Sequence, residues 1–583
     1  MSSILKNKYF KITIITIITL GIFAIASFLS IYQTEFYHNS IWSFLGPSDN
    51  RFHMMRIEGL YQSILRHDYF PVINMSFMDG FGYISNIFYS DFLLYPVTLM
   101  KLLGYSTAQA IARYYVLLNF LTFGVSFLCF YKVQRKYWNS LVFSFVYTLS
   151  SYRLHDLLFR HDLGEVGAFL FLPIAMLGIY EIFYGERKRN WLFLTFGMTG
   201  IIYSHALSPV LVAILIVIIA LCQIPELKLH PKRLLSLLWA TICSGLLSVG
   251  YFLPMLEQLK HTTFQLTKSK SILVKGSSSL QDSFNWSLSN IIDNPNIGLI
   301  LLLASVIIIV SAHKIQNKAI RHFSIIGVAT FICSSSVFPW ILLNKTPLKM
   351  IQYTWRFDMI TTILLAIFVA SDPLNILKGK TVKGLLVAFV LLLSISAGYR
   401  LIQSYTAALI PYSEYNKMSP YSIGGGQEYL PVGTNTTTLE HTKHQPKVVS
   451  GKAKITDFKQ SGTKLTFNFK NAKNAQVNLP IIGYYGFQSK NSTGQVSKLT
   501  MDKQHNNLAK ITLNGKGKVV VDYYKTSIQK SARHFSAISL AIMILTMIAY
   551  PFRSKIKPLL LKLKPKNEER ERDISPSSKI KTR

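Results

Sequence analysis

Twelve long apolar stretches divide the chain, and clusters of Lys and Arg fall in every second gap between them. A run of about 20 apolar residues is long enough to cross the hydrocarbon core of a bilayer as a helix. The pattern therefore predicts a polytopic α-helical membrane protein with about twelve transmembrane helices. The predicted spans lie near residues 10–32, 109–131, 138–152, 166–184, 191–206, 207–223, 234–253, 296–312, 322–342, 356–371, 384–402 and 535–552.

The basic clusters predict the orientation, because Lys and Arg in short loops stay on the cytoplasmic side of the membrane. Both termini are then expected inside the cell membrane. Two stretches, 86–103 and 138–152, are short or interrupted, so re-entrant segments are an alternative for them. The predicted cytoplasmic clusters are Lys132, Arg135 and Lys136; Arg187, Lys188 and Arg189; Lys228, Lys232 and Arg233; Lys314, Lys318 and Arg321; Lys378, Lys380 and Lys383; and Arg553 with the tail behind it.

The pattern changes to period two between about residues 404 and 533. Lys464–Lys470 alternates polar and apolar residues, as a half-buried strand does, and Asn514-Gly515 between two such runs is a hairpin signal. This region is predicted to be a small extracytoplasmic all-β domain.

The remaining chain is divided around that β domain. Residues 1–403 form the predicted membrane domain, with extracytoplasmic loops at 33–109 and 254–295. Residues 534–552 form the final transmembrane helix, and 553–583 form a basic cytoplasmic tail.

Composition agrees with a membrane protein, since half of the 583 residues are hydrophobic and 15% are charged. The formal net charge of +35 suits anionic lipid headgroups, and no nucleic-acid recognition motif accompanies it, so we expect no nucleic-acid partner. The four cysteines lie in apolar spans and are expected to be small core residues. Ala24-Ile25-Ala26 resembles a signal-peptide cleavage site, but the apolar run continues past it and favours an uncleaved anchor.

Ionisable residues near apolar boundaries cost free energy, and here they gather on the predicted exterior side. In a helix after the first span, Asp49, His53 and Arg56 would share one stripe and could bind a charged substrate. The alternative is an amphipathic helix that rests at the interface with its polar face in water. Asp91 lies within an aromatic segment, where it could have a functional role or be a hydrated carboxylate of an aromatic belt.

Three further places on the same side carry candidate residues. Arg160, His161 and Glu165 lie in a charged turn that is either a solvated cap or a cation-orienting site, because Glu165 opens an apolar helix. His205 is either a ligand or a buried, hydrogen-bonded histidine. Arg356 offers a planar fork for phosphate oxygens, and pairing with Asp358 or with another helix is the structural alternative.

Several motifs of soluble enzymes are absent from the sequence. It contains no HExxH, no Gly-rich phosphate loop, no serine nucleophile elbow and no Cys/His spacing of a metal site. No metal ligands and no cofactor are therefore predicted, while dependence on a divalent metal stays open.

Short motifs resemble the bacterial YfhO-like membrane proteins and the related group named after a 6-pyruvoyl-tetrahydropterin-synthase-related membrane domain. Both are placed with the GT-C glycosyltransferases. Two positions differ from the usual family pattern: Ser48 stands where Gly is common, and Tyr353-Thr354 where Phe-Pro is common. The motifs are Asp49…His53…Arg56-Ile57, Gly80-Phe81-Gly82-Tyr83, Phe88-Tyr89, Gly164-Glu165, Trp355-Arg356-Phe357, Gly426-Gln427-Glu428-Tyr429-Leu430-Pro431 and Leu479-Pro480…Gly483-Tyr484-Tyr485-Gly486.

The resemblance implies a GT-C-like fold and an enzyme that transfers a sugar from a polyprenyl phosphate to an extracytoplasmic glycopolymer or glycolipid. It implies that Asp49 is the catalytic carboxylate and that His53, Arg56, Arg160 and Arg356 stabilise the phosphate leaving group. Asp91, His161, Glu165 and His205 complete the predicted substrate-binding set. The alternatives are a polytopic transporter of lipid or solute, or a non-catalytic assembly or sensor protein of the cell envelope.

Overall fold

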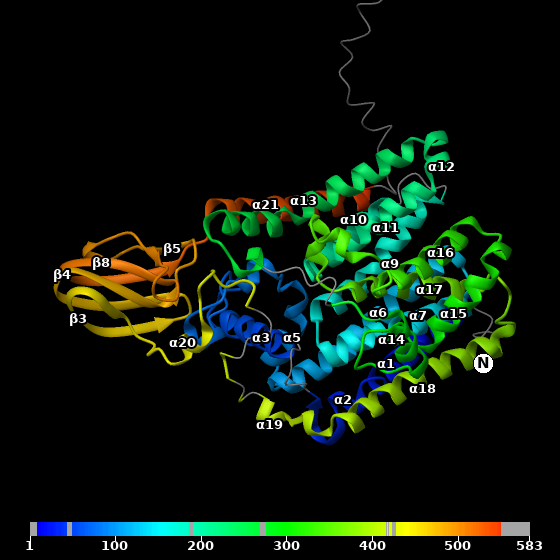
Figure 1. Cartoon of the computed structure of the whole chain (residues 1–583), viewed down its shortest axis with the longest axis horizontal. Coiled ribbons are helices and arrows are strands. Elements are labelled where there is room, and N and C mark those ends of the chain that lie inside the picture. Colours follow the sequence, from blue (N-terminus) through cyan, green and yellow to red (C-terminus); the bar gives the residue numbers. More distant parts are fainter. Residues whose placement is uncertain are drawn as a thin grey trace, which may run out of the picture.

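The computed structural model describes residues 8–42, 49–185, 191–268, 276–415, 417, 419–421 and 427–549. Among the predicted features, Ser48, Arg187–Arg189, Gly426 and the basic tail 553–583 lie outside the described residues. A large helical body fills most of the molecule, and a β-sheet projects from one end of it (Figure 1). The chain is therefore mostly helical, with a β domain near its C-terminus.

Each of the twelve predicted apolar stretches coincides with a helix. Six described helices are long and apolar enough to cross a membrane: Tyr9–Leu29, Thr107–Gln134, Leu163–Phe183, Lys232–His261, Thr354–Ser371 and Gly379–Ser404. The twelve corresponding elements are α1 (Lys8–Leu29), α6 (Thr107–Gln134), α7 (Tyr137–Thr148), α9 (Leu163–Phe183), α10 (Trp191–Ser204), α11 (Ser208–Cys222), α13 (Lys232–His261), α15 (Leu299–Ser311), α16 (Lys318–Cys333), α17 (Asp358–Ser371), α18 (Gly379–Ser404) and α21 (Ser527–Ala549).

Shorter helices fill the connections between these long ones. The stretch 86–103 is interrupted, as its sequence indicated, because it contains two helices and a turn of 3₁₀-helix. The short helices are α2 (Tyr32–Glu35), α3 (Asn50–Leu65), α4 (Ser85–Phe88), α5 (Tyr95–Leu102), α8 (Ser151–Leu154), α12 (Ile224–Leu229), α14 (Leu280–Ser289), α19 (Tyr412–Tyr415) and α20 (Thr436–Glu440).

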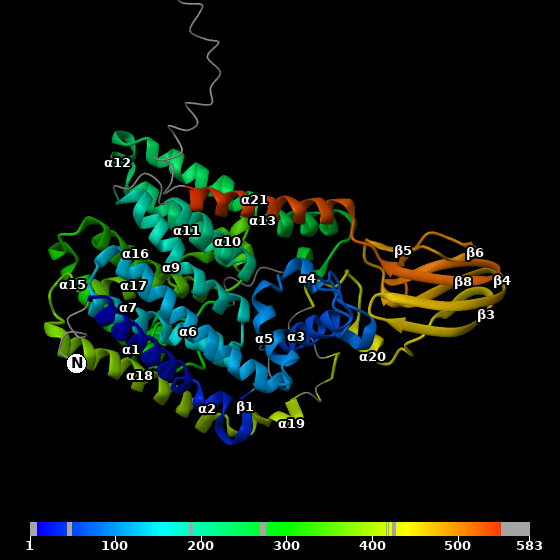
Figure 2. The same cartoon turned by 180° about the vertical axis from the view of Figure 1, so that it is seen from behind.

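Figure 2 shows α1 and α6 side by side, with α18 along the same face. The Phe23 and Phe123 rings stack with centroids 5.3 Å apart, which fixes α1 against α6. The strands β1 (Ser40–Trp42) and β2 (Leu409–Pro411) pair antiparallel and join the chain after α1 to the chain after α18. The expectation that the four cysteines are core residues is wrong: Cys129, Cys243 and Cys333 are only partly buried, and Cys222 is exposed on the apolar outer face of α11.

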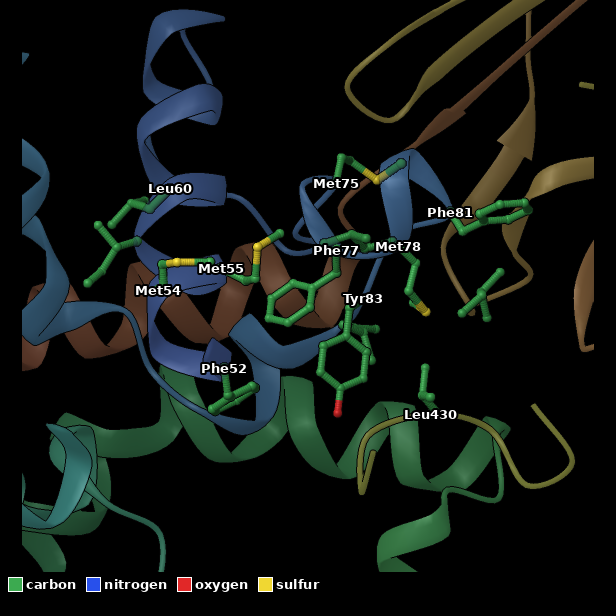
Figure 3. Close-up of a cluster of buried hydrophobic side chains, with 14 of the residues drawn as sticks. Phe52, Met54, Met55, Leu60, Met75, Phe77, Met78, Phe81, Tyr83 and Leu430 are labelled. Carbon is green, nitrogen blue, oxygen red and sulfur yellow. The ribbon is translucent and has the colours of Figure 1, made fainter. Parts of the chain in front are cut away.

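The loop between α1 and α6 forms a compact layer between the helices and the sheet. Helix α3 brings Phe52, Met55 and Leu60 into a buried cluster with Phe77 and Tyr83 of the following loop (Figure 3). Apolar side chains of the β domain belong to the same core. This layer fixes the start of α3, where Asp49 lies.

The β domain is one six-stranded antiparallel sheet whose central order is β3-β4-β8-β5. The predicted hairpin at Asn514-Gly515 is wrong: both residues lie inside strand β8, where Gly515 pairs with Ala472. Gly515 has φ +78°, so its freedom bends the strand instead of reversing it. The strands are β3 (Lys447–Ser461), β4 (Lys464–Ile482), β5 (Phe487–Ser489), β6 (Thr493–Val496), β7 (Thr500–Asp502) and β8 (Leu508–Tyr523).

Candidate functional site

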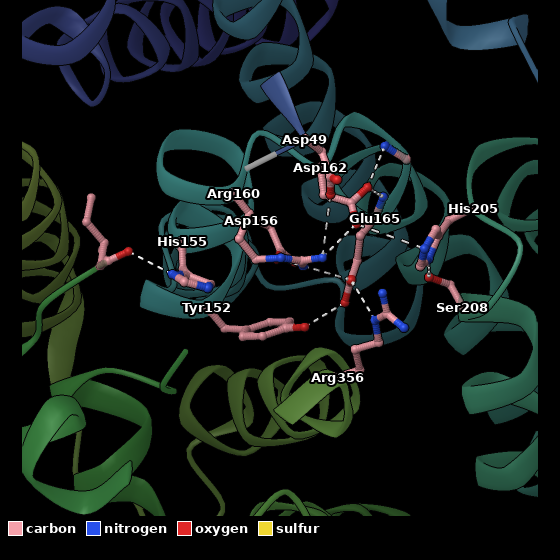
Figure 4. Close-up of polar contacts among 12 residues, drawn as sticks. Asp49, Tyr152, His155, Asp156, Arg160, Asp162, Glu165, His205, Ser208 and Arg356 are labelled. Atoms are coloured by element: carbon pink, nitrogen blue, oxygen red, sulfur yellow. Dashed lines mark hydrogen bonds and ion pairs between the residues drawn. The ribbon is translucent and has the colours of Figure 1, made fainter. Parts of the chain in front are cut away.

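Four segments that are far apart in the sequence meet at the end of the helical body nearest the sheet. The start of α3, the turn before α9, the join of α10 and α11, and the start of α17 each contribute charged or polar side chains (Figure 4). We call Asp49, Asp156, Arg160, Asp162, Glu165, His205 and Arg356 the acidic network.

Arg160 is the centre of the acidic network. Its guanidinium donates to Glu165 Oε2 at 3.2 Å and to Asp162 Oδ2 at 3.0 Å, and it also donates to Asp156. Asp49 Oδ2 lies 3.9 Å from Arg160 Nη2, and the Asp49 backbone N–H donates to the Arg160 carbonyl at 2.9 Å. One buried cation therefore holds four carboxylates together.

The local backbone explains why Arg160 points inward. Residues His155–Arg160 form a π-helical turn, and His161 after it adopts φ +56°. Extra turns of this kind redirect side chains and are frequent at functional sites. Asp162 then caps α9, accepting hydrogen bonds from the backbone N–H groups of Gly164 and Glu165 at 3.1 and 3.0 Å.

The glycine at position 164 gives Tyr89 access to the acidic network. Tyr89 donates to Asp162 Oδ1 at 2.9 Å. A Cβ atom at Gly164 would lie 1.8 Å from the Tyr89 hydroxyl, so no larger residue fits there without displacing the tyrosine. The two residues Gly164-Glu165 therefore serve the site in two ways. Gly164 leaves room for the Tyr89 hydroxyl, and Glu165 supplies a negative charge.

Arg356 completes the network from the 3₁₀ turn Thr354–Phe357, which directly precedes α17. Its Nε lies 3.8 Å from Glu165 Oε2, while its Nη1 donates to the Ile351 carbonyl at 2.7 Å. Glu165 also accepts from the Tyr152 hydroxyl at 2.6 Å. Of the two structural alternatives for Arg356, the structure shows pairing with another helix and not with Asp358.

The four carboxylates of the network differ in exposure. Asp156 and Glu165 are fully buried and Asp162 is 4% exposed, whereas the Asp49 side chain keeps 37% of its surface exposed. Asp49 is thus the carboxylate of the four that a reactant can reach.

Protonation balances the charge of the network. Its four carboxylates face two guanidinium groups, which leaves two negative charges in excess. Desolvation raises the pKa of Asp49 to about 7, and the negative charge of Asp162 adds to this while Arg160 and Arg356 oppose it. Burial and the charge of Glu165 also raise the pKa of Asp156. Near neutral pH, partial protonation of Asp49 offsets part of the excess.

Asp162 stays ionised for the opposite reason. Burial by itself raises its pKa, but His205, Arg160 and His53 outweigh that effect, so its pKa lies below the usual range. His205 Nε2 lies 4.0 Å from Asp162 Oδ2, and its Nδ1 is 2.8 Å from the Ser208 hydroxyl. Burial lowers the pKa of His205, while the negative charges of Asp162 and Glu165 oppose this.

The other predicted residues form a second group next to the network. Arg56 is buried and pairs with Asp91 at 3.1 Å, and its Nη1 lies 3.1 Å from His53 Nδ1. It also donates to the Tyr89 and Ser90 carbonyls, so it holds the loop from which Tyr89 reaches Asp162. His53 and Arg56 of the predicted stripe therefore face the protein core, contrary to the interfacial-helix alternative, while Asp49 at its start stays partly exposed.

His161 lies apart from both groups. Its Nδ1 is 3.0 Å from the Tyr115 hydroxyl of α6, and burial lowers its pKa to about 3. Its backbone conformation, not its side chain, shapes the network.

Sequence reasoning left four participants out of the predicted set: Asp156, Asp162, Tyr89 and Glu428. Asp162 had a usable signal, because an Asp two residues before Gly164 is a good helix cap. Glu428 raises the pKa of Asp49 through its negative charge, and it belongs to a motif quoted from the sequence. Nothing in the linear chain indicated that the tyrosine of Phe88-Tyr89 would reach Asp162.

Asp162, Glu165 and His205 also have the chemistry of a metal site, with one ligand atom from each within 4.8 Å of the others. Arg160 already donates to both carboxylates of this trio. A cation held there would compete with the guanidinium for the same oxygens.

Comparisons with known proteins identify the family. A model described as "6-pyruvoyl-tetrahydropterin synthase related domain; membrane protein" matches residues 88–406. The chain belongs to this family of membrane proteins. The family expected from the sequence is confirmed, and the matched range contains Arg160, Glu165, His205 and Arg356 but not Asp49.

Two individual proteins are similar to this member of the family. An uncharacterised protein of Lactococcus lactis subsp. cremoris (strain MG1363) is 22% identical over 599 residues, which cover 91% of this chain and 95% of the relative. The arabinofuranosyltransferase AftD from Mycobacteria matches with 14% identity and a TM-score of 0.39. That match covers 65% of this chain and 26% of the mycobacterial enzyme, and it is too weak to establish a shared fold.

Proposed function

We propose that this membrane protein is a glycosyltransferase that moves a sugar from a polyprenyl-phosphate donor to an acceptor in the cell envelope. The observation that carries the proposal is the partly exposed Asp49, which lies 3.9 Å from the largely buried guanidinium of Arg160 and is also influenced by the charge of Arg356. A carboxylate with a pKa near 7 can accept a proton at neutral pH. Arg160 and Arg356 can stabilise the charge that develops on a departing phosphate.

The proposed reaction is a single displacement. An acceptor hydroxyl oxygen attacks the anomeric carbon, the bond from that carbon to the phosphate oxygen breaks, and the phosphate leaves with the electron pair. Asp49 takes the hydroxyl proton. Because no second carboxylate acts as nucleophile, the anomeric configuration inverts.

Each predicted substrate-binding residue except His161 has a role in this proposal. Arg160 and Arg356 face the donor phosphate, whereas Glu165 and His205 position the guanidinium groups and Asp162. His53, Arg56 and Asp91 hold the start of α3 and the Tyr89 loop. We propose that the reaction needs no cofactor, since Arg160 already supplies positive charge between the carboxylates.

The proposed setting is the cell membrane, with both termini cytoplasmic and the β domain outside. The N-terminal end of α1 and helix α12 lie at the end of the helical body away from the sheet, which supports this orientation (Figure 1). The donor sugar would then meet its glycopolymer or glycolipid acceptor on the sheet side, where the acidic network lies.

The test of the proposal is Asp49→Asn, with Asp68→Asn as the matched control. Asn also suits the position before a helix, so α3 is expected to form. Cells that depend on either variant are compared for sugar on their envelope polymers by mass spectrometry. Loss of a general base is expected to lower transfer at least ~100-fold, whereas Asp68, which is 47% exposed and pairs with Lys525, should be dispensable. Equal product from Asp49→Asn and wild type would remove Asp49 from the mechanism.

A further inference from the structure

The β domain carries positive charge that nothing in the domain balances. Between Lys447 and Tyr523 the sequence has thirteen lysines, three aspartates and no arginine or glutamate, a formal excess of ten positive charges. Two of the acids have partners elsewhere: Asp502 pairs with Lys510, and Asp522 accepts from Thr463. The excess is therefore a property of the exposed surface.

Six of these lysines gather where the long strands bend. In the register of β3 and β4, Lys452 lies opposite Lys473, and Lys454 lies opposite Lys470. Lys516 and Lys518 flank Gly517 on β8, which pairs with Phe469 beside Lys470. All six side chains are exposed. We call Lys452, Lys454, Lys470, Lys473, Lys516 and Lys518 the lysine bend.

The backbone conformation at the lysine bend favours a change in strand direction. The pairing of β3 with β4 and of β4 with β8 is irregular on both sides of it. Gly451, Asn471, Asn474 and Gly515 all have positive φ here. Bulges of this kind sharpen the local bend and twist of a sheet.

The lysine bend is the part of the sheet farthest from the helical body. Gln460, beside the start of β4, donates to the Gly80 carbonyl, and Ile482 at the end of β4 donates to the Phe81 carbonyl. Both ends of the strand thus return to one loop, so its middle points away, as the projecting sheet in Figure 1 shows. Eight residues of strand from that loop reach about 25 Å.

Like charges directly opposite each other destabilise an antiparallel pair, and this sheet has two such pairs side by side. Within the described β domain, none of these six lysines forms an ion pair with an acid. Asp457, whose pKa is lowered by hydrogen bonds from Asn468 and Thr456, also interacts with the charge of Lys470. A partner that brings negative charge would relieve this repulsion.

We propose that the lysine bend binds an anionic polymer, a chain with repeated phosphate or carboxylate groups. Successive lysines on one face of a strand stand about 7 Å apart, a spacing that suits a charged repeat better than one small anion. The six lysine side chains lie on the exposed surface of the bend and not inside an enclosed pocket. This arrangement favours an extended partner. If the protein is the proposed glycosyltransferase, the anionic polymer is its acceptor. Binding of the polymer to the lysine bend does not itself depend on that function.

A membrane surface fits less well. Exposed charges separated by more than the Debye length of about 8–10 Å are largely screened. The lysine bend lies about 25 Å beyond the Gly80–Phe81 loop, in the sheet that projects from the helical body (Figure 1). Lipid headgroups around the helical body are therefore too distant to neutralise it.

The experiment measures binding of fluorescently labelled inorganic polyphosphate to the purified full-length protein in detergent, with no sugar donor present. The bend variant changes four lysines to Gln, and the control variant changes four other exposed lysines of the same domain, so both lose the same charge. The bend variant is Lys452→Gln, Lys454→Gln, Lys470→Gln and Lys473→Gln. The control variant is Lys447→Gln, Lys464→Gln, Lys498→Gln and Lys503→Gln.

Polyphosphate affinity is expected to fall at least ~10-fold in the bend variant and less than ~3-fold in the control. Equal losses of affinity in the two variants would mean that the polymer binds to the overall charge of the domain. No loss in either variant would mean that the domain does not bind the polymer. Either result overturns the proposal. The bend variant should unfold at the same temperature as wild type or higher, because repulsion is removed.

Two further arms separate this inference from its alternatives. Binding to phosphatidylglycerol vesicles is expected to be equal in the bend variant and wild type, and a ~10-fold loss there would assign the surface to lipid headgroups. Asp49→Asn should bind polyphosphate as wild type does. Polymer binding can therefore fail while sugar transfer stands, and transfer can fail while polymer binding stands.

Discussion

The acidic network and the lysine bend hold their charges in opposite ways. In the acidic network every charge lies within 4.0 Å of an opposite one, and the buried carboxylates share Arg160. In the lysine bend like charges face each other across two strand pairs and remain in water. A buried charge without a partner costs several kcal/mol, whereas an exposed lysine keeps its hydration. The buried charges of the network are therefore paired within the protein. The exposed lysines of the bend have no such pairing and can bind an anionic partner.

The largest difference should come from removing one cation from each region. Arg160→Met leaves three buried carboxylates without their guanidinium, and we expect a loss of about 3–5 kcal/mol in unfolding free energy. Lys470→Met at the exposed bend should change it by less than about 0.5 kcal/mol. Thermal unfolding of the two purified variants measures both.

A second substitution shows whether charge is the cause. Adding Asp156→Asn to Arg160→Met removes one of the carboxylates that lost its guanidinium partner. The double variant should therefore regain part of the lost stability. If Arg160→Met unfolds at the wild-type temperature, the network is not held together by this guanidinium. If the double variant is no more stable than the single one, lost packing against Trp355, whose ring centroid lies 4.5 Å from the Arg160 guanidinium carbon, explains the effect instead.

A change of pH is expected to have an intermediate effect on the rate of sugar transfer. The raised pKa of Asp49, about 7, means that the carboxylate is mostly protonated at pH 6 and mostly ionised at pH 8. A general base must be ionised, so kcat/KM for transfer should rise about 10-fold from pH 6 to pH 8. Polyphosphate affinity does not depend on Asp49, so it should stay level over this range.

The same shift has a consequence for stability. A carboxyl group whose pKa is raised by folding stabilises the fold at low pH, and this contribution is lost as pH rises through about 7. The difference in unfolding temperature between Asp49→Asn and wild type, with the variant higher, should therefore be larger at pH 8 than at pH 5. A flat pH profile of kcat/KM together with equal unfolding temperatures at pH 8 would show that Asp49 does not titrate near neutrality.

The smallest effect is expected from metal removal. Arg160 already bonds to the carboxylates that a divalent ion would use, so EDTA should leave the rate of sugar transfer unchanged. Added Mg²⁺ after dialysis against the chelator is the control. A loss of activity with EDTA that Mg²⁺ or Mn²⁺ restores would instead place a metal ion at Asp162, Glu165 and His205.

Much of the helical architecture could be predicted from local pattern. Each of the twelve apolar stretches contains a helix, because apolar composition over a long run outweighs single breakers such as Pro173 inside α9. The hairpin at Asn514-Gly515 failed because those residues also permit a bend inside a continuous strand, and only the pairing of β8 with β4 decides between the two. Arg56 and Asp91, predicted to bind substrate, proved to be each other's partners across 35 residues.

The sequence by itself determined the class of protein, the places of its helices and the excess of lysine in its β domain, because hydropathy and charge are properties of each residue in its local segment. Only the tertiary structure decided that Asp49, Arg160, Glu165 and Arg356 meet, since their contacts join segments separated by up to about two hundred residues. It also decided that Lys452 faces Lys473 and Lys454 faces Lys470, because strand register is set by pairing and not by composition.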